Sequence, residues 1–204
     1  AGAGVIGLAV GFGAQTLVKD VITGLFILIE DTIAVGDSVT VGGLSGGVEA
    51  MSIRSIRLRG YDGAVHTIPF SSVTTVTNST KDFSFYVLNV TVDYAVDTDK
   101  VVAVLKELGA EMQAEPAFAA NILGPVEIAG VDAFQDSAVL IKGRIKTRAG
   151  QQWGVGREFN RRMKKRFDAQ GITIPFPQQV LHISSGAAAS PFAAGMDGAS
   201  RTDA

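Results

Sequence analysis

The sequence has no cysteine and only two histidines among its 204 residues. The lack of cysteine excludes disulfide bonds, thiolate metal sites and a cysteine nucleophile. His66 and His182 lie far apart, and neither has a carboxylate and a nucleophile nearby in the sequence. An excess of one charge is absent too, because 18 basic residues nearly balance 20 acidic ones. No global field therefore favours a nucleic-acid partner, and we expect no enzyme, no metal site and no cofactor.

Apolar residues are abundant at the N-terminus. No ionisable side chain occurs from Ala1 to Val18, a run of about the minimum length for a helix that crosses a bilayer. No basic segment precedes this run, which disfavours a secretory signal peptide. Apolar residues resume after Lys19 and Asp20 and continue to Ile29. We expect one helical element over residues 1–31. Because the chain begins with Ala rather than Met, upstream segments are expected to be missing.

Small residues recur with helical spacing in the first half of this element. Gly4, Gly7 and Gly11 share one face, where small residues let neighbouring membrane helices approach closely. Leu8 and Phe12 fall on a different face. A Gly/Ala-rich buried helix of a soluble protein, with Leu8 and Phe12 in its core, fits the periodicity equally well.

The second half of the element is amphipathic, a pattern that suits a membrane interface or a partner surface. Its apolar stripe consists of Val18, Ile22, Leu25 and Ile29.

Several motifs occur in a fixed order along almost the whole chain. They are GLAVGFGAQ at 7–15, Thr-Gly at 23–24, VGD at 35–37, Gly-Val at 47–48, R-x-Y-D-G at 59–63, V-x-T-I-P at 65–69 and FDAQGITIPFPQ at 167–178. Together they resemble the small-conductance mechanosensitive channel (MscS) family. The resemblance implies a homoheptamer in the bacterial inner membrane, whose last transmembrane helix lines the pore, kinks and leads into a cytoplasmic vestibule.

The resemblance also assigns roles to residues of the N-terminal helix. Leu8 and Phe12 match the two apolar rings that close the pore, although the second ring is usually Leu. Gln15 matches the residue just before the kink, and Thr16 replaces a common hinge glycine. With Lys19 and Asp20, these two residues form the expected kink region, and Lys19-Asp20 mark the passage from bilayer core to cytoplasmic interface. Phe70 replaces a usual Asn, so no role is transferred there.

The implied function is tension-gated release of ions and small osmolytes on hypo-osmotic shock. Membrane lipids and copies of the same chain are the expected partners, and residues after about 31 are expected in the cytoplasm. The alternative is a membrane-tethered scaffold whose cytoplasmic part binds a ligand or RNA.

The implied fold is a membrane pore helix followed by an Sm-like β barrel domain (32–80) and an α+β ferredoxin-like domain (81–176). Within the first domain, the pattern predicts a long strand from Val48 to Arg59, with a bulge between Ile53 and Ile56. Asp62-Gly63 indicates a hairpin turn. GLSGG at 43–47 also predicts a hairpin turn, because it lacks the Lys and Ser/Thr of a phosphate loop.

The second domain is expected to follow a β-α-β-β-α-β order. Strands are predicted at 83–94, 126–131 and 137–147, and helices at 97–114 and 151–170. Asp97 or Thr98 would cap the first helix. A short barrel strand at 177–184, which includes His182, and a low-complexity tail at 185–204 would end the chain.

The predicted helix at 151–170 carries a cluster of basic residues: Arg157, Arg161, Arg162, Lys164, Lys165 and Arg166. Val155, Phe159, Met163 and Phe167 form an apolar stripe at i, i+4 spacing, so the basic residues are interpreted as the solvated face. The same face could provide a charged vestibule wall through Arg157, Arg161, Arg162 and Lys165. RNA binding is disfavoured, because no aromatic triplet on a strand offers a stacking platform.

Overall fold

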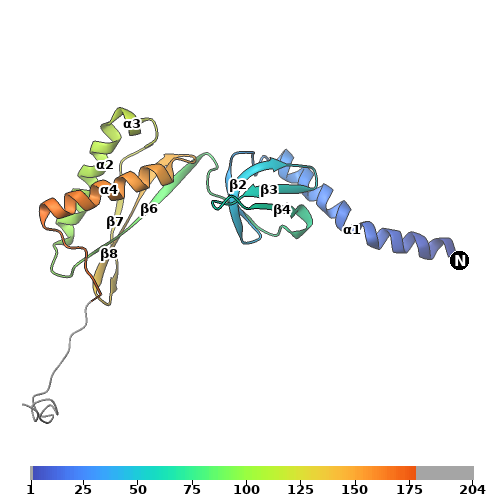
Figure 1. Cartoon of the computed structure of the whole chain (residues 1–204), viewed down its shortest axis with the longest axis horizontal. Coiled ribbons are helices and arrows are strands. Elements are labelled where there is room, and N and C mark those ends of the chain that lie inside the picture. Colours follow the sequence, from blue (N-terminus) through green and yellow to red (C-terminus); the bar gives the residue numbers. More distant parts are fainter. Residues whose placement is uncertain (1, 178–204) are drawn as a thin grey trace, which may run out of the picture.

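The chain folds into an N-terminal helix, a five-stranded β unit and an α/β unit, which follow one another in space in chain order (Figure 1). The computed structural model describes residues 2–177, and within the first turns of the helix it describes the side chains of residue 4 and of residues 7 onward. The expected barrel strand at 177–184 (beyond its first residue), His182 and the tail lie outside the described residues. The elements are α1 (Gly2–Ile29), β1 (Ser38–Val41), β2 (Leu44–Met51), β3 (Ser55–Arg59), β4 (Val65–Pro69), η1 (Phe70–Ser72), β5 (Val76–Asn78), β6 (Phe83–Val92), α2 (Thr98–Ala114), α3 (Pro116–Ala119), β7 (Glu127–Gln135), β8 (Ala138–Arg148) and α4 (Gln152–Gln170).

The β unit is an antiparallel sheet with strand order β4-β3-β2-β1-β5. Its strands alternate buried and exposed residues, and the buried ones enclose a core that includes Val39, Val41, Leu58 and Phe70. Gly42 and Gly43 join β1 to β2 with φ angles of 57° and 81°, which only glycine adopts easily. The expected hairpin at Asp62-Gly63 is confirmed, since β3 and β4 pair antiparallel around it.

The prediction of a single strand from Val48 to Arg59 is wrong. The chain reverses after Met51, and β2 pairs with β3 as a hairpin. The Ser52 hydroxyl accepts hydrogen bonds from the backbone N–H groups of Arg54 and Ser55 at 3.3 and 3.0 Å, which stabilise the turn. A bulge exists, but it lies between Val48 and Ala50 in β2. The turn expected over residues 43–47 is confined to Gly42 and Gly43, and β2 already begins at Leu44.

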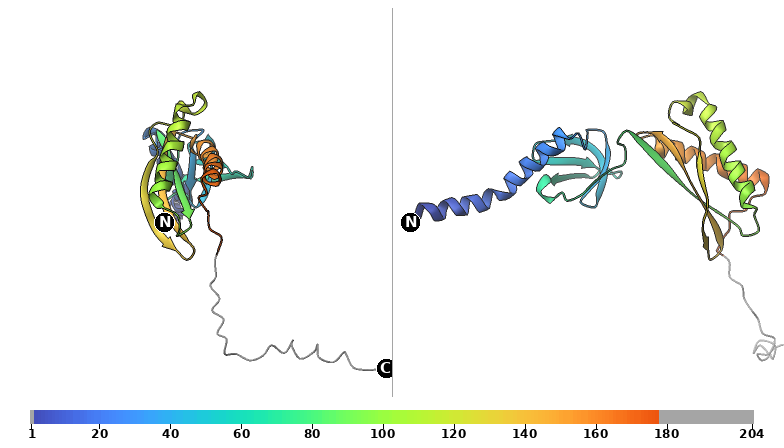
Figure 2. Two further views of the ribbon diagram at one scale, coloured as in Figure 1. Left: turned by 90° about the vertical axis from the view of Figure 1, so that its left-hand side faces the viewer. Right: turned by 180° about the vertical axis from the view of Figure 1, so that it is seen from behind.

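The α/β unit is a three-stranded sheet of order β6-β8-β7 with helices on one face (Figure 2). Asp97 caps α2 by accepting a hydrogen bond from the Asp99 N–H at 2.9 Å. The core lies between the helices and the sheet, and Val155, Phe159 and Phe167 of α4 are buried in it, as the i, i+4 stripe predicts. Apart from the short additional helix α3, the elements follow the expected order as far as α4. The last strand of a ferredoxin-like fold would fall after residue 177.

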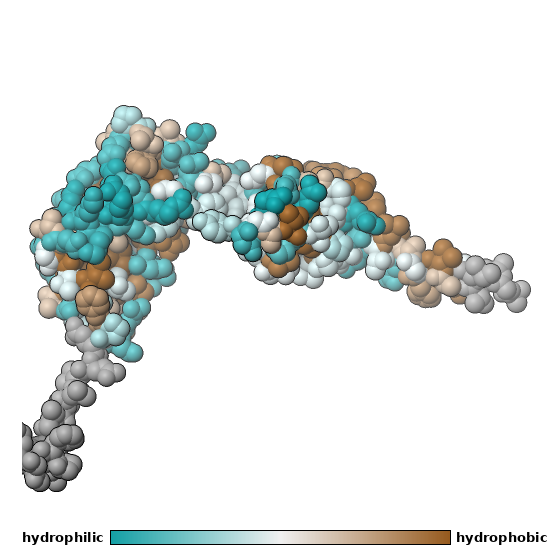
Figure 3. Space-filling view, in the orientation of Figure 1, coloured by the Kyte–Doolittle hydropathy of each residue, from teal (hydrophilic) through white to brown (hydrophobic). Residues whose placement is uncertain are grey.

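The helix α1 is the one described element long and apolar enough to cross a membrane, over Gly7–Ile29. It is a single hydrogen-bonded helix from Gly2 to Ile29. Its second half packs on the β unit through contacts with η1, whereas its first half extends away from the rest of the chain (Figure 1). Apolar side chains cover much of its visible surface (Figure 3).

Candidate functional site: the groove and docking face of the N-terminal helix

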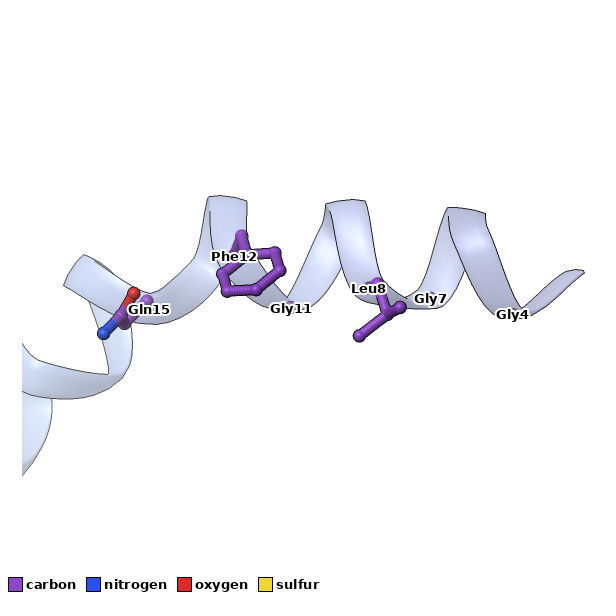
Figure 4. A pocket seen from close by; sticks show the side chains of 6 residues that line it. All are labelled: Gly4, Gly7, Leu8, Gly11, Phe12 and Gln15. Carbon is purple, nitrogen blue, oxygen red and sulfur yellow. The ribbon is translucent and has the colours of Figure 1, made fainter.

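The first half of α1 carries an open groove of about 540 Å³. Its lining residues are Gly4, Gly7, Leu8, Gly11, Phe12 and Gln15, all from this one helix (Figure 4). The glycines and the two bulky residues, which periodicity places on separate faces, thus border the same groove. Leu8 and Phe12 are 64% and 74% exposed, so neither is a core residue within this chain.

Among the described residues, no neighbour requires glycine at the groove positions. A Cβ atom added at Gly4, Gly7 or Gly11, or at Gly13 outside the groove lining, would meet nothing within 4 Å. Glycine inside a helix costs about 1 kcal/mol relative to alanine. No contact among the described residues offsets this cost.

The helix changes direction near Gln15 (Figure 4) while its hydrogen-bonded course continues to Ile29. Gln15 and Thr16 are both exposed. The structure therefore places a bend in the region that the sequence assigns to the kink, in a glycine-rich stretch and without a helix break.

Lys19 and Asp20 both bind Ser71, which lies in the 3-10 turn η1. The Asp20 carboxylate accepts a hydrogen bond from the Ser71 N–H at 2.5 Å, and the Lys19 ammonium donates to the Ser71 carbonyl at 2.8 Å. Asp20 is only 7% exposed. The two charges bind α1 to the β unit across about 50 residues of sequence, and their expected place at a membrane boundary stays a prediction.

Gly24 continues this docking face one turn further along the helix. A Cβ atom at Gly24 would lie 2.7 and 2.9 Å from two ring carbons of Phe70, and still closer to the Ile53 carbonyl oxygen. Only glycine permits this approach, and Ile27 packs against the same β core one turn later. The residues of the predicted apolar stripe, Val18, Ile22, Leu25 and Ile29, point elsewhere and are all about half exposed or more.

A polar cluster joins the end of α1 to the segment that connects the two units. Lys81 donates hydrogen bonds to the Asp31 carboxylate, at 2.7 Å, and to the Asp31 carbonyl. The hydrogen bond to the Asp31 side chain raises the pKa of Lys81. Asn78 donates to Asp37 at 2.7 Å and to the Thr32 carbonyl. The connection is therefore hydrogen-bonded to the β unit rather than a free linker.

The basic cluster on α4 is largely neutralised. Arg162 pairs with Glu158 and Glu115, Arg161 with Glu158, Lys164 with Asp168 and Arg166 with Glu111. Arg162 lies partly buried between α4 and α3, so describing every member of the cluster as solvated face is wrong. Hydrogen bonds from Arg161 and Arg162 lower the pKa of Glu158 to about 2. Arg157 and Lys165 have no ion-pair partner among residues 2–177.

No group of three or more His, Cys, Asp or Glu side chains among the described residues is arranged to hold a metal ion. His66 lies in β4, opposite Leu58 of β3, and is half-buried.

Comparison with known proteins assigns both units to one family. The family model "Mechanosensitive ion channel, beta-domain" matches residues 16–81, and "Mechanosensitive ion channel MscS, C-terminal" matches residues 86–174. The first match begins at Thr16, so it includes the half of α1 that docks on the β unit. All the residues that line the groove lie outside both matches.

Curated relatives and a solved structure agree with this assignment. The small-conductance mechanosensitive channel of Caldanaerobacter subterraneus is 40% identical over 182 residues, which cover 89% of this chain and 64% of the relative. The moderate conductance mechanosensitive channel YbiO of Escherichia coli is 40% identical over 196 residues, or 96% of this chain and 26% of the relative. The closed-state crystal structure of Helicobacter pylori MscS superposes with a TM-score of 0.74 at 25% identity, over 89% of this chain and 71% of that chain.

The chain spans less than two thirds of the length of these two curated relatives. The two family models together cover the second half of α1, the β unit that receives it and most of the α/β unit. The chain belongs to the MscS family of mechanosensitive channels.

Proposed function

We propose that the chain forms the pore-lining helix and cytoplasmic part of a tension-gated ion channel. It would release ions and small osmolytes on hypo-osmotic shock and would act as a homo-oligomer, with seven copies, in a bacterial inner membrane. The groove on α1 carries this proposal, because its glycines and its exposed Leu8 and Phe12 have no partner within the described chain.

The gate is assigned to Leu8 and Phe12. In a ring of parallel helices, Gly4, Gly7 and Gly11 would receive the neighbouring helix, while Leu8 and Phe12 at i and i+4 would form two apolar rings around the axis. A narrow apolar constriction excludes water and hence ions. Tilting and separation of the helices would widen it, and membrane lipids would transmit the tension.

The docking face of α1 would couple this gate to the cytoplasmic units. Asp20 and Lys19 bind Ser71, and Gly24 contacts Phe70, so movement of the lower helix carries the β unit with it. The bend near Gln15 and Thr16 separates the gate from this anchored half. We assign residues 1–31 to the pore helix, 32–80 to an Sm-like β domain and 81–176 to a ferredoxin-like domain, all after about residue 31 lying in the cytoplasm.

Two variants of the complete channel subunit test the gate. Leu8→Ser and Phe12→Ser should wet the constriction, so that channels open at lower tension in excised patches and cells grow more slowly. Leu25→Ser serves as the matched control, because Leu25 is a similarly exposed apolar residue of α1 outside the groove. If both groove variants gate at unaltered tension, these side chains are not the gate.

A membrane-tethered scaffold that binds RNA or a ligand is the competing function. It requires an anchor but no ring of helices, so the mass of the detergent-solubilised protein separates the two. About seven copies support the channel, whereas a monomer or dimer rules it out.

A further inference from the structure

The turn between β2 and β3 lies against the membrane-length helix α1. It consists of Ser52, Ile53 and Arg54, and the Ile53 carbonyl oxygen is the atom nearest to a Cβ added at Gly24. This glycine belongs to the candidate membrane span Gly7–Ile29. The β unit therefore contacts the span itself, near the C-terminal end of the span.

Two estimates place this contact close to the border between hydrocarbon and lipid headgroups, in a membrane that α1 crosses. From Gly7, where the span starts, Gly24 lies about 25 Å along the helix at about 1.5 Å per residue, and the hydrocarbon core is about 30 Å thick. From Asp20, where the sequence predicts the membrane boundary, Gly24 lies about 6 Å further on, and each headgroup layer is about 5–7 Å thick. Both estimates put the turn within about 6 Å of the border.

Exposed apolar side chains occur on both elements at this level. Ile53 is 54% exposed at the tip of the turn, and Ile22, Leu25 and Phe26 of α1 are 50%, 48% and 57% exposed. Transfer of apolar surface from water to the apolar edge of a bilayer is favourable. A membrane at this level would therefore stabilise the turn as well as the helix.

Arg54 is exposed and forms no ion pair with residues 2–177. The other basic residues between positions 32 and 82 each pair with a carboxylate: Arg57 and Arg59 with Glu49, and Lys81 with Asp31. Asp20, the acidic residue of α1 that docks on the β unit, is buried and accepts a hydrogen bond from the Ser71 N–H. Arg54 is therefore the cation of the β unit that remains available to a ligand outside the described chain.

The backbone of the turn is held in place, whereas the guanidinium of Arg54 is not. The Ser52 hydroxyl accepts hydrogen bonds from the N–H groups of Arg54 and Ser55, and the Arg54 carbonyl accepts one from the Phe70 N–H at 3.0 Å. A guanidinium has five N–H donors whose planar arrangement matches the oxygens of a phosphate. The turn thus presents an apolar tip beside a phosphate-binding group, the combination that a lipid headgroup layer requires.

We propose that the β2–β3 turn is a lipid-binding site, in which Ile53 enters the apolar edge of the bilayer and Arg54 pairs with the phosphate of an anionic phospholipid. This inference rests on the proposed channel function, because it requires α1 to lie in a membrane. A free phosphate ion would satisfy Arg54 alone, whereas a phospholipid also provides apolar surface for Ile53. One basic residue near an anionic membrane surface changes the affinity about fivefold.

Native mass spectrometry of the complete channel, titrated with phosphatidylglycerol, tests Arg54. Arg54→Gln should weaken one lipid site per subunit about fivefold, and it should keep the tension-activated current because the turn is held by backbone hydrogen bonds. Arg57→Gln is the matched control. It removes the same charge three residues away and leaves Glu49 paired with Arg59, so its affinity for phosphatidylglycerol should equal that of the wild type.

A fluorophore on Ile53→Cys, in a complete subunit free of other cysteines and reconstituted in phosphatidylglycerol-containing vesicles, tests insertion. Quenchers attached to the lipid chains near the headgroup should reduce its emission. The control is Tyr61→Cys, because Tyr61 is fully exposed in the hairpin at the opposite end of β3, on the order of 15–20 Å away at about 3.3 Å per residue. A label there should be quenched from water and not from lipid.

Three outcomes would overturn the inference. In the first, Arg54→Gln binds phosphatidylglycerol as tightly as Arg57→Gln does. In the second, lipid-attached quenchers reach the label at position 53 no better than the label at position 61. In the third, the label at position 53 is shielded from quenchers in both lipid and water, which would make the turn a contact with another protein segment. All three leave the wild-type current in place, whereas absence of any tension-activated current in the wild type would instead refute the proposed function.

Discussion

Replacing Gly24 with alanine should detach α1 from the β unit. The added Cβ would lie 2.7 Å from a Phe70 ring carbon, whereas ordinary contacts begin at 3.4 Å. The ring would have to move by about 0.7 Å, and the Ile53 carbonyl oxygen, which is backbone and lies closer still to the added Cβ, requires a larger shift of the helix itself. Overpacking of this kind typically costs about 1–3 kcal/mol.

This free-energy cost applies only to the state in which α1 is docked on the β unit. Alanine favours the helix by about 1 kcal/mol over glycine, but α1 stays helical whether it is docked or not, so this gain cancels between the two states. A loss of about 1–3 kcal/mol raises the population of the undocked state about 5- to 150-fold.

Hydrogen exchange reports this population directly. The Ser71 N–H is bonded to Asp20 of α1, so this amide should exchange faster when α1 undocks. Mass spectrometry of the peptide covering residues 68–73, in the detergent-solubilised channel, should show the increase in the Gly24→Ala variant.

Gly13→Ala is the matched control, because it makes the same change in the same helix at a position where a Cβ meets nothing within 4 Å. It should leave exchange of this peptide unchanged. Equal protection in wild type and Gly24→Ala would refute the reasoning, since the close approach would then not limit docking.

Two further predictions concern the polar contacts. Asp20→Ala should lower the unfolding temperature, because the Ser71 N–H loses its acceptor at a cost of about 1–3 kcal/mol, while Asp20→Asn keeps an acceptor oxygen and should lose less. Equal losses would argue against this hydrogen bond. The pKa of Glu158 is about 2 in the folded chain against an ordinary 4.5, so its stabilisation is complete above pH 4.5 and is lost as the pH falls toward 2. Thermal unfolding between pH 5 and 2.5 should therefore depend less on pH in Glu158→Gln, and an unchanged slope would contradict the prediction.

Local sequence patterns predict the elements of the α/β unit well, but they do not predict contacts between residues far apart in the sequence. The Asp97 cap and the i, i+4 stripe of α4 depend on residues that lie close together in the sequence. The sequence therefore predicts both helices to within a residue or two at each end. The Asp20–Ser71 hydrogen bond joins residues 51 apart in the sequence, and no local sequence pattern predicts it. The sequence pattern does not predict the chain reversal at Ser52, because apolar residues occur on both sides of the short polar turn.

A row of basic residues on one face of β8 could have been found from the sequence. Lys142, Arg144, Lys146 and Arg148 alternate with period two, which places them on one face of the predicted strand. Apolar periodicity identifies only the buried side of such a strand. Only the structure shows that carboxylates pair with most of the basic residues of α4, whereas Lys146 and Arg148 have no carboxylate partner among residues 2–177.

The glycines of α1 fall into two groups with different physical reasons. Gly24 is explained within the chain, because Phe70 and the Ile53 carbonyl fill the space of a side chain. Gly4, Gly7 and Gly11 are not explained by any contact among the described residues. Together they destabilise the helix by about 3 kcal/mol relative to alanine. Lipid chains adapt to any helix surface and gain nothing from a flat one, whereas a second rigid helix packs closely only where side chains are small. We propose that the contact that offsets this cost is another protein helix, and that a neighbouring copy of α1 fits the groove between the glycines and Phe12.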